Sequence, residues 1–339
     1  MTVSLPSRGL RGYAGGVLAG GVSAGIFTYS LTLKSVAFVM LSILAASPLF
    51  IVGLGAGVEA GILAVVTAFA LLVATKTVNF AAYYAVVFGF PASALTFLAL
   101  RRRDGPDGKT VWFPEGDLLT AMTLYPCVAF IAAEAAALSY KNGLLGMALD
   151  VMKTYADQLK THPVDPTHND PRVLEQFIAL LNVLAHMLPA LIGCGWILVM
   201  LLSMFVSQIT LRQQGWNLRP DFEIAKIFVS KWLAIAALAG VLAGYYAPAP
   251  FNYIGGNLCA MLLVPYFFQG IAVVHAKAAS SLFRLWILWG YYVFLLFPFK
   301  WTTAAAFFLT ILLGIVDVWA NFRPRFAARQ LSMQLKIRG

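Results

Sequence analysis

The chain has 339 residues, of which 60% are hydrophobic and 11% are charged, and its formal net charge is +10 at pH 7. Soluble domains carry about 25% charged residues, so this composition excludes an ordinary water-soluble globule. A basic excess in a soluble protein would indicate nucleic acid as a partner, but here the charges lie in short blocks between apolar runs, a pattern that predicts orientation in a lipid bilayer.

A helix needs about twenty apolar residues to cross the roughly 30 Å hydrocarbon core of a bilayer. We predict an all-α integral membrane protein, a single polytopic domain over residues 1–339 with a bundle of 8 to 10 transmembrane helices. The candidate spans are residues 13–33, 36–52, 56–75, 78–100, 118–140, 177–209, 231–248, 254–276, 284–297 and 302–320. Only Gly53, Leu54 and Gly55 separate the second and third candidates, and the ninth is short enough for a tilted or re-entrant helix.

The basic residues test this topology, because Lys and Arg of short loops concentrate on the cytoplasmic side of a membrane. If the N-terminus lies inside and ten spans alternate, seventeen of the 24 basic residues fall in cytoplasmic segments and seven fall outside. We therefore predict an even number of spans with both termini cytoplasmic. Residues 324–339 then form a basic cytoplasmic tail.

The sizeable segment between spans is the predicted outside loop of residues 141–176. Between Leu144 and Leu159, apolar residues recur at three- and four-residue steps, and Asp150 and Asp157 fall on the other side, as in an amphipathic helix. We expect this helix to lie on the outer leaflet, and a lid over a cavity is the alternative. The loop continues with His162, Asp165, His168 and Asp170. No helix imposes a ligand spacing on these four residues, so no metal site is predicted.

The first candidate span carries small residues at four-residue steps: Gly12, Gly16, Gly20 and Ala24. Small residues on one face let another helix approach closely, which is the usual packing device between helices in lipid. The face packs either against a helix of the same chain or against a separate membrane protein. The sequence leaves both alternatives open.

Five ionisable side chains lie within the candidate spans: Glu59, Glu134, His186, His275 and Asp317. Burying such groups in lipid is costly unless they pair or face water. The topology places Glu59, His275 and Asp317 near the cytoplasmic ends of their spans, and Glu134 and His186 nearer the outer side. A carboxylate beside a histidine can bind a cation or a polar solute. We therefore expect the inner three to line a shared cavity and the outer two to form a secondary polar pair, although the inner groups would also tolerate simple contact with lipid headgroups.

Gln269 lies between Pro265 and Gly270, where we expect the eighth span to bend or unwind. Broken helices line solute sites in membrane proteins because their free backbone groups can bind ligand. Gln269 would then supply hydrogen bonds deeper in the cavity. A proline kink that neighbouring helices satisfy is the alternative.

Three stretches resemble the YybS-like (DUF2232) family of bacterial multi-pass membrane proteins: PLFIVGLGAG at 48–57, QGIAVVH at 269–275, and LGIVD at 313–317 with NFR at 321–323. The resemblance implies a multi-pass protein of the bacterial cytoplasmic (inner) membrane. That family is thought to be distantly similar to the substrate-binding subunits of energy-coupling-factor vitamin transporters. This similarity would imply that the small-residue face docks on a partner, although such subunits have fewer spans and no vitamin-binding signature is visible here.

We predict a transport or solute-binding protein that holds a small solute or cation in a helix-lined cavity, with Glu59, Gln269, His275 and Asp317 as ligand-binding residues. A partner or an ion gradient would supply the energy, because the chain has no GxxxxGK[ST] nucleotide loop. We expect no cofactor. One alternative is a non-catalytic membrane scaffold or assembly factor. Another is an intramembrane enzyme acting on lipid, with His275 and a carboxylate as acid and base.

Overall fold

The structure, a computed structural model, describes residues 10–32, 36–105, 107–161, 171–224, 227–279, 281–296, 300–323 and 326. The chain forms two compact units. Unit 1 comprises Met1–Met122, Ile197–Val229 and Phe267–Gly339, and unit 2 comprises Thr123–Trp196 and Ser230–Tyr266. The predicted basic tail, apart from Phe326, and the residues His162, Asp165, His168 and Asp170 lie outside the described residues.

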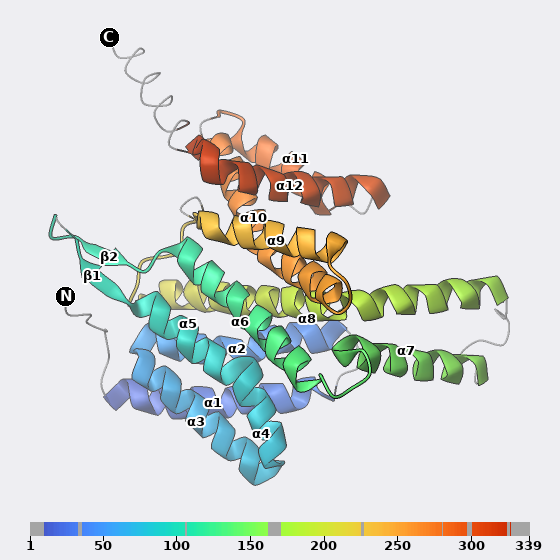
Figure 1. The fold of residues 1–339 in the computed structure, drawn as a ribbon. Coiled ribbons are helices and arrows are strands. Elements are labelled where there is room, and N and C mark those ends of the chain that lie inside the picture. The colour runs from blue at the N-terminus through green and yellow to red at the C-terminus, as the bar shows by residue number, and fades with distance from the viewer. Residues whose placement is uncertain are drawn as a thin grey trace. The chain divides into compact units, whose positions relative to one another are not determined.

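Helices form most of both units (Figure 1). Unit 1 contains α1 (Leu10–Ser30), α2 (Val36–Ala56), α3 (Val58–Thr75), α4 (Val78–Tyr84), the π-helical segment η1 (Ala85–Gly89), α5 (Phe90–Leu100), β1 (Arg102–Asp104), β2 (Thr110–Trp112), α11 (Arg284–Leu296) and α12 (Lys300–Ala320). Unit 2 contains α7 (Gly143–Thr161) and α9 (Lys231–Tyr246). Both units share α6 (Glu115–Ala136), α8 (Pro171–Gln214) and α10 (Phe251–Ala279).

Among the described residues, five helical segments are long and apolar enough to cross a membrane: Val58–Thr75, Val78–Leu100, Glu115–Ala136, Glu175–Gln214 and Phe251–Ala279. Shorter apolar helices of 10–17 residues cover Leu44–Ala56, Lys231–Tyr246, Arg284–Leu296 and Ala304–Ala320. The chain is therefore an all-helical multi-pass membrane protein. The total of 8 to 10 spans and the cytoplasmic location of the termini stay predictions.

The N-terminal part of unit 1 is a three-helix cluster in which α1, α2 and α3 all contact one another. The sequence places the break between the second and third spans at Gly53 to Gly55, but α2 continues through these residues and ends at Ala56. The break lies at Gly57, whose φ of 117° belongs to a region that side chains other than glycine rarely adopt. Backbone geometry at one glycine thus sets the boundary.

A buried hydrogen-bond chain links three segments of this unit. Ser23 Oγ donates to the Ala45 carbonyl at 2.6 Å, so Tyr84 Oη donates to Ser23 Oγ at 2.5 Å. Tyr84 is fully buried and immediately precedes η1. The π turn therefore begins next to a side chain that a polar contact holds in the core.

A short antiparallel hairpin follows α5, and the sequence patterns do not predict it. Arg102 pairs with Trp112 and Asp104 with Thr110, and the Arg102 guanidinium lies 5.9 Å from the centre of the Trp112 ring. The strands have three residues each, too few for an alternating hydrophobic pattern to appear.

Unit 2 contains the helix predicted in the outside loop. This helix, α7, has exposed Met147, Val151 and Tyr155 at four-residue steps, while Ala148 and Ala156 are buried. Figure 1 shows α7 running in the opposite direction to the first part of α8. With 44 residues, α8 is about 66 Å long at 1.5 Å per residue, about twice the thickness of a bilayer core.

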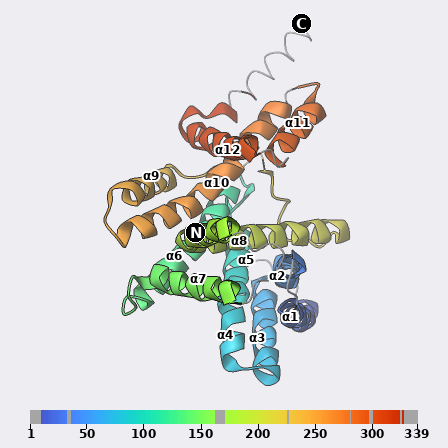
Figure 2. The ribbon, with the colours of Figure 1, turned by 90° about the vertical axis from the view of Figure 1, so that its right-hand side faces the viewer.

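The other half of unit 2 is the pair α9 and α10, which Figure 2 shows side by side. Their contact uses glycines: a Cβ built on Gly240 would lie 3.0 Å from the Gly255 carbonyl oxygen, and one on Gly244 would lie 3.3 Å from the Gly256 Cα. The helix α10 is continuous through Pro265 and Gly270, so the expected unwinding at this place is not observed.

Candidate functional sites

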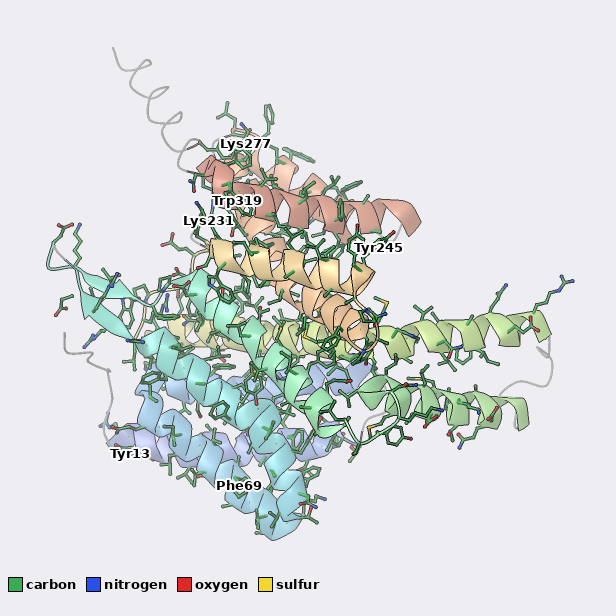
Figure 3. The ribbon with its side chains drawn as sticks, viewed as in Figure 1. Tyr13, Phe69, Lys231, Tyr245, Lys277 and Trp319 are labelled. Atoms are coloured by element: carbon green, nitrogen blue, oxygen red, sulfur yellow. The ribbon has the colours of Figure 1, made fainter. Side chains whose placement is uncertain are left out.

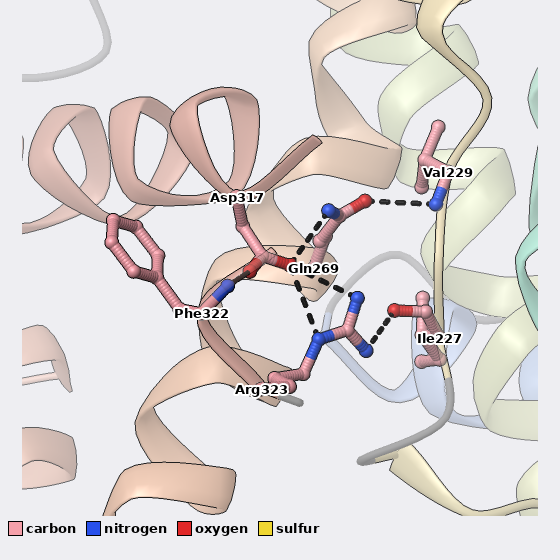
Figure 4. Close-up of polar contacts among 6 residues, drawn as sticks. All are labelled: Ile227, Val229, Gln269, Asp317, Phe322 and Arg323. Carbon is pink, nitrogen blue, oxygen red and sulfur yellow. Dashed lines mark hydrogen bonds and ion pairs between the residues drawn. The ribbon is translucent and has the colours of Figure 1, made fainter. Parts of the chain in front are cut away.

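The first candidate site joins two residues that the sequence singled out, Gln269 and Asp317 (Figure 4). Gln269 lies on α10 and Asp317 near the end of α12, and both side chains are fully buried. Gln269 Nε2 donates to Asp317 Oδ2 at 3.0 Å. Asp317 Oδ2 also forms an ion pair with Arg323, whose Nε lies at 3.1 Å and whose Nη2 at 3.0 Å. The Phe322 backbone N–H donates to Asp317 Oδ1 at 2.9 Å.

The same cluster holds the segment that precedes α9. Gln269 Oε1 accepts from the Val229 backbone N–H at 2.8 Å, and Arg323 Nη1 donates to the Ile227 carbonyl at 2.5 Å. Since Asp317 neutralises Arg323 and the backbone groups are paired, the desolvation cost of these buried groups is offset. We call this set the Asp317 cluster: Ile227, Val229, Gln269, Asp317, Phe322 and Arg323.

Gly270 brings α10 and α12 together beside the cluster. A Cβ at Gly270 would collide with the backbone oxygen of Thr310. The glycine therefore allows close helix packing, which is the common use of small residues between helices in lipid. This packing explains the glycine without an unwound helix.

Protein groups occupy both oxygens of Asp317 as well as the carbonyl and amide of Gln269. Binding of a solute or cation by these two residues stays a prediction. In the observed arrangement, such binding requires Arg323 to move away from Asp317.

The other two predicted ligand residues have separate partners. Glu59, in the first turn of α3, accepts a hydrogen bond from the Tyr13 hydroxyl; Figure 3 marks Tyr13 on α1. His275 Nε2 lies 2.8 Å from the Tyr292 hydroxyl of α11. Thus the interactions of the described residues bring Gln269 and Asp317 together, but they pair Glu59 and His275 with tyrosines.

The small-residue face of α1 lies against α3. A Cβ on Gly16 would lie 2.7 Å from the Ala60 carbonyl oxygen, and one on Gly20 would collide with the backbone of Ala64. Gly12 faces the end of α2 and the start of α3, and Ala24 is buried. Of the two alternatives for this face, the structure shows packing within the chain.

The second candidate site is a pocket of about 510 Å³ in unit 2. Its walls come from α7, α8, the segment before α10, and α10. We call it the unit 2 pocket, and its lining residues are Leu145, His186, Met187, Ala190, Ala249, Asn252, Tyr253, Gly256, Asn257 and Ala260. Ligand sites in proteins usually have volumes of about 300–1,000 Å³ and mostly apolar walls with a few polar groups, and this pocket has both properties.

Asn257 fixes the two long helices that form the pocket. Its Oδ1 accepts from the Ala190 backbone N–H at 2.9 Å, and its Nδ2 donates to the carbonyls of His186 and Tyr253, both at 2.9 Å. In an unbroken helix the Ala190 N–H would bond to the His186 carbonyl. The Asn257 amide therefore bridges these two groups of α8 next to Pro189, where proline disturbs the helical ladder.

Three other polar side chains line the pocket. Tyr253 is 8% exposed, and its hydroxyl is buried with no hydrogen-bond partner among the described residues. His186 Nδ1 lies 2.8 Å from the Asn182 carbonyl; since a carbonyl only accepts, Nδ1 carries the proton and Nε2 is the acceptor of the neutral ring. Asn252 Oδ1 accepts from the Tyr253 backbone N–H at 2.7 Å, which leaves the Nδ2 amino group to face other partners.

Glu134 stabilises the start of α7. Its Oε2 accepts from the Leu144 backbone N–H at 3.2 Å, and a carboxylate at a helix N-terminus is favoured by the helix dipole. Among the described residues, Glu134 and His186 have different hydrogen-bond partners, so no direct contact joins this predicted pair. Nearby, the Tyr140 hydroxyl donates to Asp150 at 2.6 Å, and this hydrogen bond raises the pKa of Tyr140.

Arg219, in the segment before α9, is a buried charge that the hydropathy and charge patterns do not distinguish from other basic loop residues. Its Nη1 donates to the Ala99 carbonyl at 3.0 Å, and its Nη2 pairs with Glu115 in the first turn of α6 at 3.0 Å. Burial lowers the pKa of Arg219, and Glu115 opposes this effect. The sequence signal that could indicate this pair is an acidic residue at the start of a helix, which alone does not identify its partner.

Comparisons with known proteins identify the family. A search of curated proteins gives no match, and a search of solved structures gives none. One family model, described as a predicted membrane protein, matches residues 22–318. The match agrees with the resemblance drawn from the three sequence stretches, while a similarity to energy-coupling-factor subunits stays a prediction. Because the model covers most of the chain, this protein belongs to the DUF2232 family of predicted membrane proteins.

Proposed function

We propose that this protein binds a small solute within the membrane and that the unit 2 pocket is the binding site. The observation that carries the proposal is a cavity of about 510 Å³ whose mostly apolar wall includes Tyr253, a residue with a buried hydroxyl that has no hydrogen-bond partner among the described residues. An unpaired buried hydroxyl costs roughly 1–3 kcal/mol. Tyr253 lines the pocket, and a solute that reaches its hydroxyl would supply the missing partner.

The pocket is supported by groups that do not themselves need to bind the solute. The hydrogen bonds of Asn257 occupy its whole amide, so this residue sets the spacing of α8 and α10. At Gly256 an added Cβ would meet no atom within 4 Å. The glycine thus contributes space to the pocket, and preformed space lowers the ordering cost of binding.

The predicted ligand residues of unit 1 serve a different purpose in this proposal. The Asp317 cluster ties α10, α12 and the segment before α9 together through its paired charges. A tie of this kind stabilises unit 1. Solute binding at Glu59 and His275 is not needed for the proposed function.

The proposed orientation of the protein in the membrane rests on the distribution of its basic residues. Because seventeen of the 24 basic residues lie in the segments assigned to the inside, we place the protein in the bacterial cytoplasmic membrane with both termini in the cytoplasm. Movement of the solute across the bilayer, driven by a partner or an ion gradient, is the corresponding transport prediction. Uptake of a bound probe into proteoliposomes measures this movement directly.

The binding test fills the pocket. Gly256→Leu places a side chain in the open space, and Gly195→Leu is the matched control, because Gly195 also has no atom within 4 Å of an added Cβ but does not line the pocket. The full chain in lipid nanodiscs is titrated with three six-carbon probes, hexan-1-ol, hexanoate and hexylammonium. Hydrogen exchange of residues 183–191 and 249–260 reports binding.

We expect at least one probe to slow exchange in the wild type and in Gly195→Leu, and none to do so in Gly256→Leu. Equal protection in all three proteins would mean that the probes act through the bilayer. A lack of protection by every probe in the wild type would also contradict the proposed function.

A further inference from the structure

The free polar groups of the unit 2 pocket restrict the chemistry of its occupant. Resting on the proposed function, we infer that the pocket selects an uncharged amphiphile with a hydroxyl group. The lining residues include no Asp, Glu, Lys or Arg. A charged ligand would therefore meet no permanently charged side chain among the lining residues, and burying an unpaired charge costs far more than burying a hydrogen-bonded neutral group.

The hydrogen-bonding groups of the pocket wall further restrict the class of ligand. His186 Nε2 is an acceptor, because the proton of the neutral ring lies on Nδ1 toward Asn182. Asn252 Nδ2 is a donor, because its Oδ1 accepts from the Tyr253 backbone. The Tyr253 hydroxyl, which is buried and has no hydrogen-bond partner in the described part of the chain, is able to donate or accept. The pocket thus offers both donors and an acceptor.

A hydroxyl group matches this set because it donates one hydrogen bond and accepts others. A carboxylate only accepts and would leave the His186 acceptor unmatched. An ammonium only donates and would leave the Asn252 amino group unmatched. Glu134 is not among the lining residues, and its carboxylate accepts from the first turn of α7. Its charge does act on Tyr253, so the comparison of hexylammonium with hexan-1-ol also tests whether this carboxylate attracts a cation.

The remaining lining residues fit the apolar part of such a molecule. Leu145, Met187 and Ala260 present hydrocarbon or thioether surface, and Gly256 leaves room. Apolar surface gains roughly 25 cal/mol for each Å² that it removes from water. The apolar wall therefore supplies affinity, and the three polar groups select the headgroup. The hydroxyl compound comes either from the water phase or from a membrane lipid.

The test compares ligands that differ only in the headgroup. Wild-type protein in nanodiscs is titrated with hexan-1-ol, hexanoate and hexylammonium, and with dioctanoylglycerol as a hydroxyl-bearing lipid. We expect hexan-1-ol or dioctanoylglycerol to bind at least tenfold more tightly than either ion. Tighter binding of hexan-1-ol indicates a water-borne ligand, and tighter binding of dioctanoylglycerol indicates a lipid.

Two variants remove the polar contacts. Tyr253→Phe deletes one hydroxyl, and His186→Leu deletes the acceptor; each should weaken binding of the preferred hydroxyl compound by about fivefold to tenfold, the effect of one hydrogen bond. Tyr245→Phe is the control, because Tyr245 is 80% exposed on α9 and lies outside the pocket lining (Figure 3). It should bind like the wild type.

The outcomes separate this inference from the proposed function. If hexanoate or hexylammonium binds as tightly as the hydroxyl compounds and Gly256→Leu still abolishes the binding, the pocket is a solute site but the hydroxyl preference is wrong. The same conclusion follows if both Tyr253→Phe and His186→Leu bind the alcohol normally. If no probe binds the wild-type pocket, the proposed function itself fails.

Discussion

Gln269 and Asp317, separated by 48 residues in the sequence, share a 3.0 Å hydrogen bond between two fully buried side chains. Because Arg323 also pairs with Asp317, this hydrogen bond is part of a cluster in which the buried polar groups bond to one another. A closed polar cluster in a membrane domain holds helices together, since each of its groups would be costly to leave unpaired.

Removal of Arg323 should destabilise the protein strongly. Arg323→Ala leaves the buried Asp317 carboxylate without its counterion, and breaking a buried ion pair costs about 3–5 kcal/mol. Unfolding of the purified protein by sodium dodecyl sulfate measures the loss. The double variant Asp317→Asn with Arg323→Met removes both charges and should recover much of the stability. Equal stability of Arg323→Ala and the wild type would show that the cluster is not structural.

The buried and the exposed arginine ion pair should differ in their contribution to the free energy of unfolding. Arg219 pairs with Glu115 and is 3% exposed, whereas the Arg212 side chain is 73% exposed and lies 3.3 Å from Asp221. We expect Arg219→Ala to lower the free energy of unfolding by about 3–5 kcal/mol and Arg212→Ala to change it by about 0–1 kcal/mol. Denaturant titration of both variants checks this contrast, and similar losses would contradict it.

Two glycines of α1 should respond in opposite directions to alanine. A methyl group at Gly20 would collide with the Ala64 backbone and lie 2.8 Å from Thr67 Cβ, whereas one at Gly25 meets nothing within 4 Å. We expect Gly20→Ala to destabilise the protein by about 1–3 kcal/mol through overpacking. Gly25→Ala should be neutral or stabilising, by up to about 1 kcal/mol, because alanine favours helix. Thermal unfolding in nanodiscs measures both variants, and destabilisation by Gly25→Ala alone would contradict the observed packing.

Asn257 should control the order of α8 around Pro189. Asn257→Leu keeps similar volume but leaves the Ala190 N–H and the His186 carbonyl without the bridging amide, a loss of about 1–3 kcal/mol. Hydrogen exchange at residues 187–191 should become faster. Asn182→Ala, an exposed position on the same helix, serves as the control and should leave these rates unchanged. Slow exchange in both variants would show that the bridge is not needed.

The helices of this protein are largely predictable from the sequence. Each candidate span overlaps an observed helix, and the amphipathic pattern between Leu144 and Leu159 corresponds to α7. Long apolar runs leave the backbone no alternative to helix in lipid, since each backbone polar group must bond within its own segment. The short hairpin and the exact break at Gly57 were missed, because both depend on local backbone geometry and not on hydrophobic periodicity.

The candidate sites were only partly predictable. Membrane depth selected Asp317, and the position between Pro265 and Gly270 selected Gln269; these two residues do meet. The depth argument also grouped Glu59 and His275 with Asp317, yet Glu59 contacts Tyr13 and His275 contacts Tyr292. Membrane depth orders residues along one axis only, and it carries no information on which helices are neighbours.

The sequence by itself determined the class of this protein, an all-α multi-pass membrane protein, because hydropathy acts on each segment separately. The concentration of basic residues on the cytoplasmic side stays a prediction. Only the tertiary structure decided which buried polar groups pair and where space remains. Arg323 closes the site at Asp317, and Asn257 and Gly256 help to form the unit 2 pocket. These outcomes depend on contacts between distant segments, because the energy of a buried polar group depends strongly on whether it has a partner.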